Sequence, residues 1–149
     1  MIEPNPNWHP YDDDAEFDAR CKGSEDAEQM ALMAWAARAM YHGKWPELKL
    51  LHHIPNGGER SVVVATKLKA MGTKPGVPDL FLPVARHGVH GLYIELKKDW
   101  KFGGGKASAV QLEWRDALID CGYGWALAQG WKEARETLIQ YLSEPAPAP

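Results

Sequence analysis

The chain has 149 residues, of which 45% are hydrophobic and 25% are charged. These values suit one soluble globular domain, and they exclude wholesale disorder and a fibrous repeat. The longest nearly apolar stretch, residues 30–40, is too short to cross a bilayer, and the N-terminus does not resemble a secretory signal. Two cysteines, Cys21 and Cys121, are too few for a disulfide scaffold. We therefore expect a reduced, cytoplasmic protein with no membrane partner.

The net charge of −3 is distributed unevenly along the chain. Residues 1–43 carry a balance of −6, whereas residues 44–141 carry +4, and the basic excess reaches +6 between residues 44 and 110. A mildly basic body is compatible with a polyanionic partner such as DNA, although charge alone does not indicate one.

Both ends of the chain have compositions that disfavour packed structure. Residues 1–23 combine prolines with an acidic run at 12–18, which is typical of an extended or weakly ordered arm. Residues 143–149, SEPAPAP, indicate a frayed tail. The folded domain is expected to span residues 24–142.

The first half of this domain predicts a helix, a strand and a second helix. Ser24 is a good N-cap before an acidic first turn and helically spaced apolar residues, which predicts a helix over 24–42. The apolar run 48–54 predicts a buried strand. Residues 60–71 are compatible with a strand or a helix, and we favour a helix that ends at Gly72.

The second half predicts a hairpin followed by a helix, a strand and a closing helix. Strands 79–84 and 91–98 flank a turn at 86–90 and form an antiparallel hairpin. A flexible loop is expected over 101–108. Ser108 then caps a helix whose apolar face consists of Val110, Trp114, Ala117, Leu118 and Cys121, and a strand at 124–128 and a helix at 131–142 follow. This order predicts an α/β domain with a mixed sheet flanked by helices.

Three charged residues of the hairpin carry the chemical signal. Side chains alternate along a strand, so Glu95 and Lys97 share one face, and a turn near His87 places Asp79 opposite Glu95. Two neighbouring carboxylates suit a hard cation such as Mg²⁺ or Mn²⁺, which can hold a phosphate oxygen and activate water. Lys97 could then stabilise the developing charge.

The same residues also have an ordinary structural interpretation. Acidic and basic residues that alternate at the end of a strand commonly form a solvated face, and Asp after Pro is common in turns. The apolar run at residues 92–94 suits an interior strand, and the charges that follow it need a reason to enter such a strand, which favours a functional role.

A resemblance to a known family adds to this interpretation. The ordered strings GVPDLFLPV, GLYIELK and GYGWALAQGW, with Gln111 and Trp114 between the last two, resemble the VRR-NUC family of virus-type replication-repair nucleases in the PD-(D/E)XK superfamily. The resemblance covers about residues 24–142, and Glu25, Gln29 and the loop 54–58 are similar to the stand-alone phage and bacterial members. It implies a restriction-endonuclease-like core and a metal-dependent DNA endonuclease.

The resemblance also implies roles for individual residues. Asp79 and Glu95 would bind Mg²⁺ or Mn²⁺ with help from the Leu96 carbonyl, and Lys97 would be the catalytic lysine. Gln111 would lie near the active centre; its ordinary interpretation is a surface helix residue. The first-helix glutamate of the family, which would also help to bind the metal ion, corresponds to Glu25, with Glu28 as the alternative. Without the resemblance, Glu25 is simply an acid at the positive end of a helix dipole.

Partners follow from the same resemblance. It implies a homodimer that acts on branched DNA such as Holliday junctions. Candidate DNA-binding residues are Asn56, Arg60, Lys74, Lys98, Lys101 and Lys106. Two features depart from the family pattern: Glu59 stands where a basic residue is more usual, and the acidic arm is additional. The arm could cover the basic surface, but a solubilising segment is the simpler interpretation.

Two other functions remain compatible with the sequence. A non-cleaving DNA-binding or assembly module on the same scaffold would bind without metal dependence. An unrelated metal-dependent hydrolase would act on free nucleotides. Substrate and metal assays separate these alternatives from a polymer nuclease.

Overall fold

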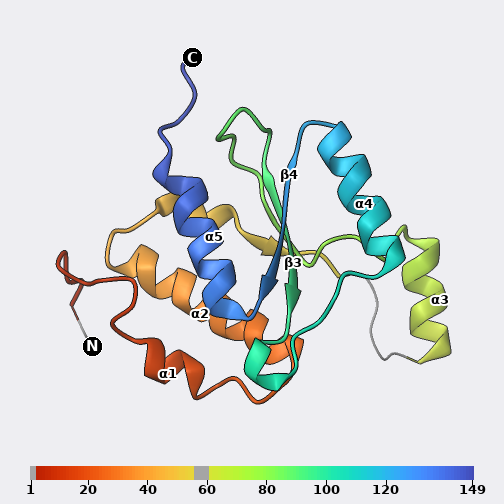
Figure 1. The fold of residues 1–149 in the computed structure, drawn as a ribbon, viewed down its shortest axis with the longest axis horizontal. Helices are drawn as coiled ribbons and strands as arrows, with labels where there is room; N and C mark the ends of the chain where they lie inside the picture. The colour runs from red at the N-terminus through yellow and green to blue at the C-terminus, as the bar shows by residue number, and fades with distance from the viewer. Residues whose placement is uncertain (1–2, 56–60) are drawn as a thin grey trace.

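The computed structural model of the chain describes residues 3–55 and 61–149 (Figure 1). Its helices are α1 (Asp14–Asp18), α2 (Glu25–Tyr41), α3 (Val62–Ala70), α4 (Ala109–Asp120) and α5 (Trp131–Ser143), with 3₁₀ helices η1 (Pro46–Leu50) and η2 (Trp100–Phe102). The strands are β1 (His52–His53), β2 (Leu80–Leu82), β3 (Leu92–Lys97) and β4 (Gly124–Gln129). Within the described ranges, no helix has the length and apolar composition needed to span a membrane.

The four strands form one mixed sheet in the order β1-β2-β3-β4. The pairs β1–β2 and β2–β3 are antiparallel, and β3–β4 is parallel. The predicted α/β class, with helices around a mixed sheet, is confirmed, as is the hairpin formed by β2 and β3. Its register pairs Leu80 with Ile94, so the chain continues with Asp79 next to Glu95.

One face of the sheet is fully buried and holds the core. Alternation along the strands directs Leu80, Leu82, Ile94, Leu96 and Ala128 to this face, and all five are buried. Helices α2 and α5 cover it, as Figure 1 shows, and they contribute the buried side chains of Leu32, Trp35 and Leu138 to the same cluster. This apolar contact fixes the position of β3 at the centre of the sheet.

The opposite face carries half-buried aromatic side chains and, at one end, the buried polar side chains of Glu95, Lys97 and Gln129. Phe81 and Tyr93 stack with ring centroids 4.2 Å apart, and Tyr123 packs edge-on against both. Helices α3 and α4 lie on this side of the sheet (Figure 1), and neither has a buried residue. The expected apolar face of α4 is therefore only partly covered.

The expectation of an extended or weakly ordered N-terminal arm is wrong for the residues described. Residues 14–18 form α1, and Trp8, Phe17 and Cys21 belong to the core cluster. The acidic run pairs with basic residues of the two core helices, in the ion pairs Glu16–Arg38, Asp18–Lys132 and Asp14–Arg135. The apolar side chains at 8, 17 and 21 are buried in the core and stabilise this segment, which its acidic composition alone does not predict. This pairing also argues against an arm that covers the basic surface.

Two further segments differ from the expectations. The expected strand at 48–54 is largely replaced by η1. Leu48 within it and Leu51 directly after it are both buried, and their spacing of three residues fits a 3₁₀ turn. Only His52 and His53 remain as β1, and both are exposed. The loop expected at 101–108 begins within η2. The helices predicted over 24–42, 60–71 and 131–142, the helix capped by Ser108 and the strand at 124–128 are confirmed within the described residues.

Candidate active site

The hairpin brings Asp79 to the end of β3 that carries Glu95 and Lys97. Asp79 Oδ2 accepts a hydrogen bond of 2.8 Å from the backbone N–H of Leu96. The N–H and C=O of an extended residue point towards the same neighbouring strand. The Leu96 carbonyl therefore faces the side on which Asp79 lies, as the predicted ligand set requires.

Glu95 is a buried carboxyl group with one satisfied and one unsatisfied oxygen. Its side chain contacts Gln111 Nε2 at 2.8 Å and Lys97 Nζ at 3.5 Å, both through Oε1. Oε2 is buried and has no hydrogen-bond partner among the described residues. Burial, reinforced by the charge of Asp79 and opposed by Lys97, raises the pKa of Glu95 to about 8. A nearby cation would relieve this cost.

Gln111 connects Glu95 and Lys97 to the start of α4. Lys97 is 7% exposed, and its Nζ donates to Gln111 Oε1 at 3.0 Å. The same oxygen accepts the Ser108 N–H at 2.8 Å, and Ser108 Oγ accepts the Gln111 N–H at 3.3 Å, which completes a capping box. The Ser-x-x-Gln spacing is the sequence signal for this box. The structure thus brings Gln111 into direct contact with two of the predicted site residues.

The structure separates the two candidate glutamates on α2. Glu25 is exposed and lies near the site, where the charges of Lys97, Asp79 and Lys98 act on it; loss of surrounding water is the main cause that raises its pKa. Glu28 is 1% exposed, and its Oε2 accepts the Trp131 N–H at 2.8 Å. Glu28 therefore caps the N-terminus of α5. Of the two, only Glu25 can reach the candidate site.

Gln129 is a residue near the site that the sequence analysis missed. Its side chain pairs with the backbone of Gly105, where Oε1 accepts the N–H at 2.9 Å and Nε2 donates to the C=O at 2.6 Å. Gly105 lies over the aliphatic stem of Lys97, because a Cβ placed there would be 3.1 Å from Lys97 Cδ. The parallel register, which pairs Lys97 with Gln129, explains the contact. That register was not evident from the sequence.

Asp79 and Glu95 are the two acidic side chains that could bind a divalent cation here. Among residues 3–55 and 61–149, no group of three His, Cys, Asp or Glu side chains is gathered closely enough to hold a metal ion. Glu25 is thus a neighbour of the Asp79–Glu95 pair and not a third member of a closed cluster. Mg²⁺ retains several waters and is often bound by one or two carboxylates, so two carboxylates and a carbonyl suit it. The unpaired Glu95 Oε2 is the observation that favours such an ion.

The predicted DNA-binding residues lie in different parts of the structure. Asn56 and Arg60 lie outside the described residues. Lys74 is exposed beside α4 and lines a pocket, whereas Lys101 lies near Asp18 of α1, where their charges interact. Lys98 and Lys106 flank the loop above Lys97, and Lys106 is exposed. Their role in DNA binding stays a prediction.

Comparison with known proteins identifies a similar solved structure. The chain is similar to a solved structure described as a "VRR_NUC domain protein", with 34% sequence identity and a TM-score of 0.67. The similarity covers 82% of this chain and 90% of the other. No protein-family model and no curated protein matches the chain.

Proposed function

The chain belongs to the VRR-NUC family of nuclease domains, and from this premise we propose that it is a Mg²⁺- or Mn²⁺-dependent endonuclease that hydrolyses phosphodiester bonds in DNA. The observation that carries the proposal is the arrangement of Asp79, Glu95 and Lys97, in which one buried carboxylate oxygen lacks a partner beside an amine. Burial and the neighbouring charge of Asp79 make it costly to ionise both carboxyl groups together, and a divalent cation would relieve that cost.

Each residue has a distinct task in the proposed reaction. Asp79, Glu95 and the Leu96 carbonyl would hold the ion, which when bound polarises the phosphate and lowers the pKa of a coordinated water. Lys97 carries its positive charge 3.5 Å from Glu95, where it can orient the attacking water or stabilise charge on the phosphate. Gln111 holds the Lys97 amine and Glu95 in one hydrogen-bonded group. Glu25 lies within electrostatic range of Asp79 and Lys97 and would add negative charge that favours a bound cation.

The test is cleavage of linear, nicked, flap and four-way DNA with Mg²⁺, Mn²⁺ or EDTA. We expect cleavage with either metal and none with EDTA. Asp79→Asn should abolish cleavage while the melting curve remains cooperative. Asp120→Asn, which alters an exposed acid at the end of α4, is the matched control and should retain activity. Full activity of purified Asp79→Asn would contradict the proposal, whereas tight metal-independent binding without cleavage would favour a DNA-binding module.

We further propose a homodimer that prefers branched DNA. The support is the resemblance to stand-alone family members, together with the physical argument that two symmetric sites can cut two strands of a nearly symmetric junction. Light scattering, with and without a four-way junction, measures the stoichiometry. A monomer under both conditions, or equal cleavage of linear and four-way DNA, would refute this part of the proposal and leave the nuclease assignment intact.

A further inference from the structure

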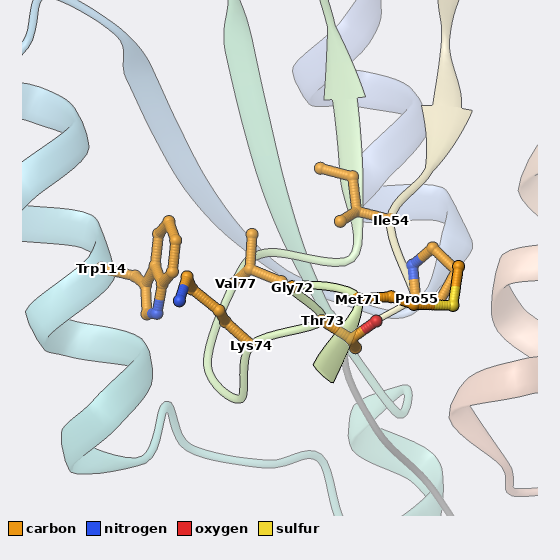
Figure 2. Close-up of a pocket in the computed structure, with 8 residues that line it drawn as sticks. All are labelled: Ile54, Pro55, Met71, Gly72, Thr73, Lys74, Val77 and Trp114. Atoms are coloured by element: carbon orange, nitrogen blue, oxygen red, sulfur yellow. The ribbon is translucent and has the colours of Figure 1, made fainter. Parts of the chain in front are cut away.

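A pocket of about 420 Å³ lies between the end of β1, the end of α3 and the middle of α4. Figure 2 shows Trp114 on one side and Ile54, Pro55 and Met71 on the other, with Lys74 and Val77 between them. The volume is near the lower end of the range of roughly 300–1,000 Å³ found for small-ligand sites. The pocket is therefore large enough for one small group and too small for a duplex segment.

The aromatic wall of the pocket is held in a fixed orientation. Trp114 Nε1 donates to the Pro75 carbonyl at 3.0 Å. The indole also packs closely on Gly76, where an added Cβ would lie 2.9 Å from Trp114 Cδ1 and 2.8 Å from Val110 Cγ2. Gly76 has a φ of +87°, a conformation that favours glycine. A ring held in this way can stack on a ligand with little loss of side-chain freedom.

The pocket also contains one positive charge. Lys74 is exposed and forms no ion pair with any residue in the described ranges. In Figure 2 its side chain extends towards Trp114. An aromatic ring, an aliphatic wall and an exposed ammonium group together match a nucleobase and its phosphate, because bases stack on aromatic side chains and phosphates attract lysine.

Two connections link the pocket to the candidate active site. The Ile54 N–H donates to the Asp79 carbonyl at 2.8 Å, and Val77 lies two residues before Asp79. Trp114 lies one helical turn from Gln111, which contacts Glu95. The pocket therefore lies next to the candidate active site. A DNA strand with a phosphate at Asp79 and Glu95 would pass the opening of the pocket.

From these observations we infer that the pocket binds one unpaired nucleotide of the DNA substrate, next to the phosphate that is cleaved. The base stacks on Trp114 and its phosphate contacts Lys74. This inference rests on the proposed nuclease function and specifies what the enzyme recognises: an extrahelical base, which a fully paired linear duplex does not offer without unstacking. Branch points and bulges supply such bases.

The test measures binding in EDTA, so that cleavage does not enter. The probes are a duplex with one extra, unpaired 2-aminopurine, the same duplex with a bulged abasic nucleotide, and the fully paired duplex. We expect the wild-type chain to bind the 2-aminopurine bulge about tenfold more tightly than either of the other two, the size expected for one base stacked on an aromatic ring. Fluorescence of the 2-aminopurine should change on binding.

Variants identify the pocket as the origin of the preference. Trp114→Leu should bind all three probes equally, with unchanged affinity for the paired duplex, and Trp114→Phe should retain most of the preference. Tyr41→Leu is the control, because Tyr41 is an exposed aromatic residue about 24 Å along α2 from Glu25. Melting curves confirm that each variant is folded. If Trp114→Leu proves unstable, Lys74→Ala replaces it and should weaken binding of the bulged probe more than that of the paired duplex.

The outcomes separate this inference from the proposed function. Metal-dependent cleavage by the wild-type chain, combined with equal binding of the three probes or an unchanged preference in folded Trp114→Leu, overturns the pocket assignment alone. Absence of cleavage combined with the predicted binding pattern overturns the nuclease assignment and leaves the pocket. A Trp114→Leu variant that changes only the oligomeric state would assign the pocket to a second copy of the chain and overturn the inference.

Discussion

The two faces of the central sheet differ in chemical character although they share the same strands. On the face covered by α2 and α5, Ile94 and Leu96 are no more than 1% exposed and pack within a continuous apolar core. On the face next to α4, β3 presents Tyr93, Glu95 and Lys97. The alternating directions of neighbouring residues thus place the apolar core on one face and the candidate active site on the other.

This division explains how charged groups can be held in an interior strand. The apolar face supplies the burial energy that positions β3, and the opposite face can then tolerate an unsatisfied carboxylate oxygen. Substitutions on the two faces should therefore affect different measurements.

The largest effect is expected at Lys97. Lys97→Met should lower kcat by about 10²–10³-fold or more, since it removes a charge positioned for the transition state, while the melting temperature should stay the same or rise. Single-turnover cleavage and a melting curve provide the two measurements. Lys49→Met, on exposed η1, is the matched control and should change neither. If Lys97→Met lowered the melting temperature as well as kcat, the proposed separation of stability and activity between the two faces would be wrong.

Ile94 lies on the other face of the sheet, and its substitution is expected to lower stability and to leave activity nearly unchanged. Ile94→Ala removes a fully buried side chain and should destabilise the fold by about 2–5 kcal/mol. Activity per folded molecule should be nearly unchanged at a temperature where the variant is folded. Denaturant titration measures the first quantity. A loss of activity similar to that of Lys97→Met, in a fully folded sample, would show that the two faces are coupled.

The two glutamates of α2 allow the same comparison of stability with activity within a single helix. Glu28→Ala leaves the Trp131 N–H without its acceptor and should cost about 1–3 kcal/mol of stability. Glu25→Gln should leave stability unchanged and weaken metal-dependent activity. Paired melting and cleavage measurements on both variants decide the assignment. Reversed effects would make Glu28 the site residue.

A smaller effect is expected in the pH dependence of the stability of the metal-free protein. The pKa of Glu95 is raised to about 8 in the folded state, so the folded state binds this proton more tightly than the unfolded state does. Its contribution to stability is fully present below the ordinary carboxyl pKa and is lost as the pH rises towards 8. The melting temperature in EDTA should fall over that interval by about 2–4 °C for each kcal/mol lost.

Mn²⁺ should reverse this decrease, because a cation would replace the proton at Glu95. Glu95→Gln should show neither the pH-dependent decrease nor the rescue by Mn²⁺. The measurement is a thermal melt at half-unit pH intervals with EDTA or Mn²⁺. The same pH dependence in Glu95→Gln would assign the titration to another group.

The elements with a strong local signal could be predicted from the sequence. The caps at Ser24 and Ser108 fixed two helix starts, and the pattern around Asp79 and Glu95 gave the hairpin and its register. Strand alternation was sufficient to place Glu95 and Lys97 on one face. These are properties of neighbouring residues along the chain, which local patterns describe well.

The features that failed depend on contacts between distant segments. The composition of the N-terminal segment predicts an irregular acidic arm. Phe17 in this segment is nevertheless buried against Trp131, 114 positions later. The run at 48–54 was taken as a strand because Leu51 and the other apolar residues fit several periods equally well. Gln129 was missed because only the parallel pairing of β3 with β4 places it beside Gly105 and Lys97.

The Gln111 carboxamide oxygen receives both the Ser108 N–H and the Lys97 ammonium group. The first turn of α4 and the position of the Lys97 amine are consequently linked through one acceptor. Local fraying of that turn would remove this acceptor from Lys97. Under the proposed function, a partner that holds the start of α4 would therefore favour the arrangement needed for cleavage without contacting the scissile bond.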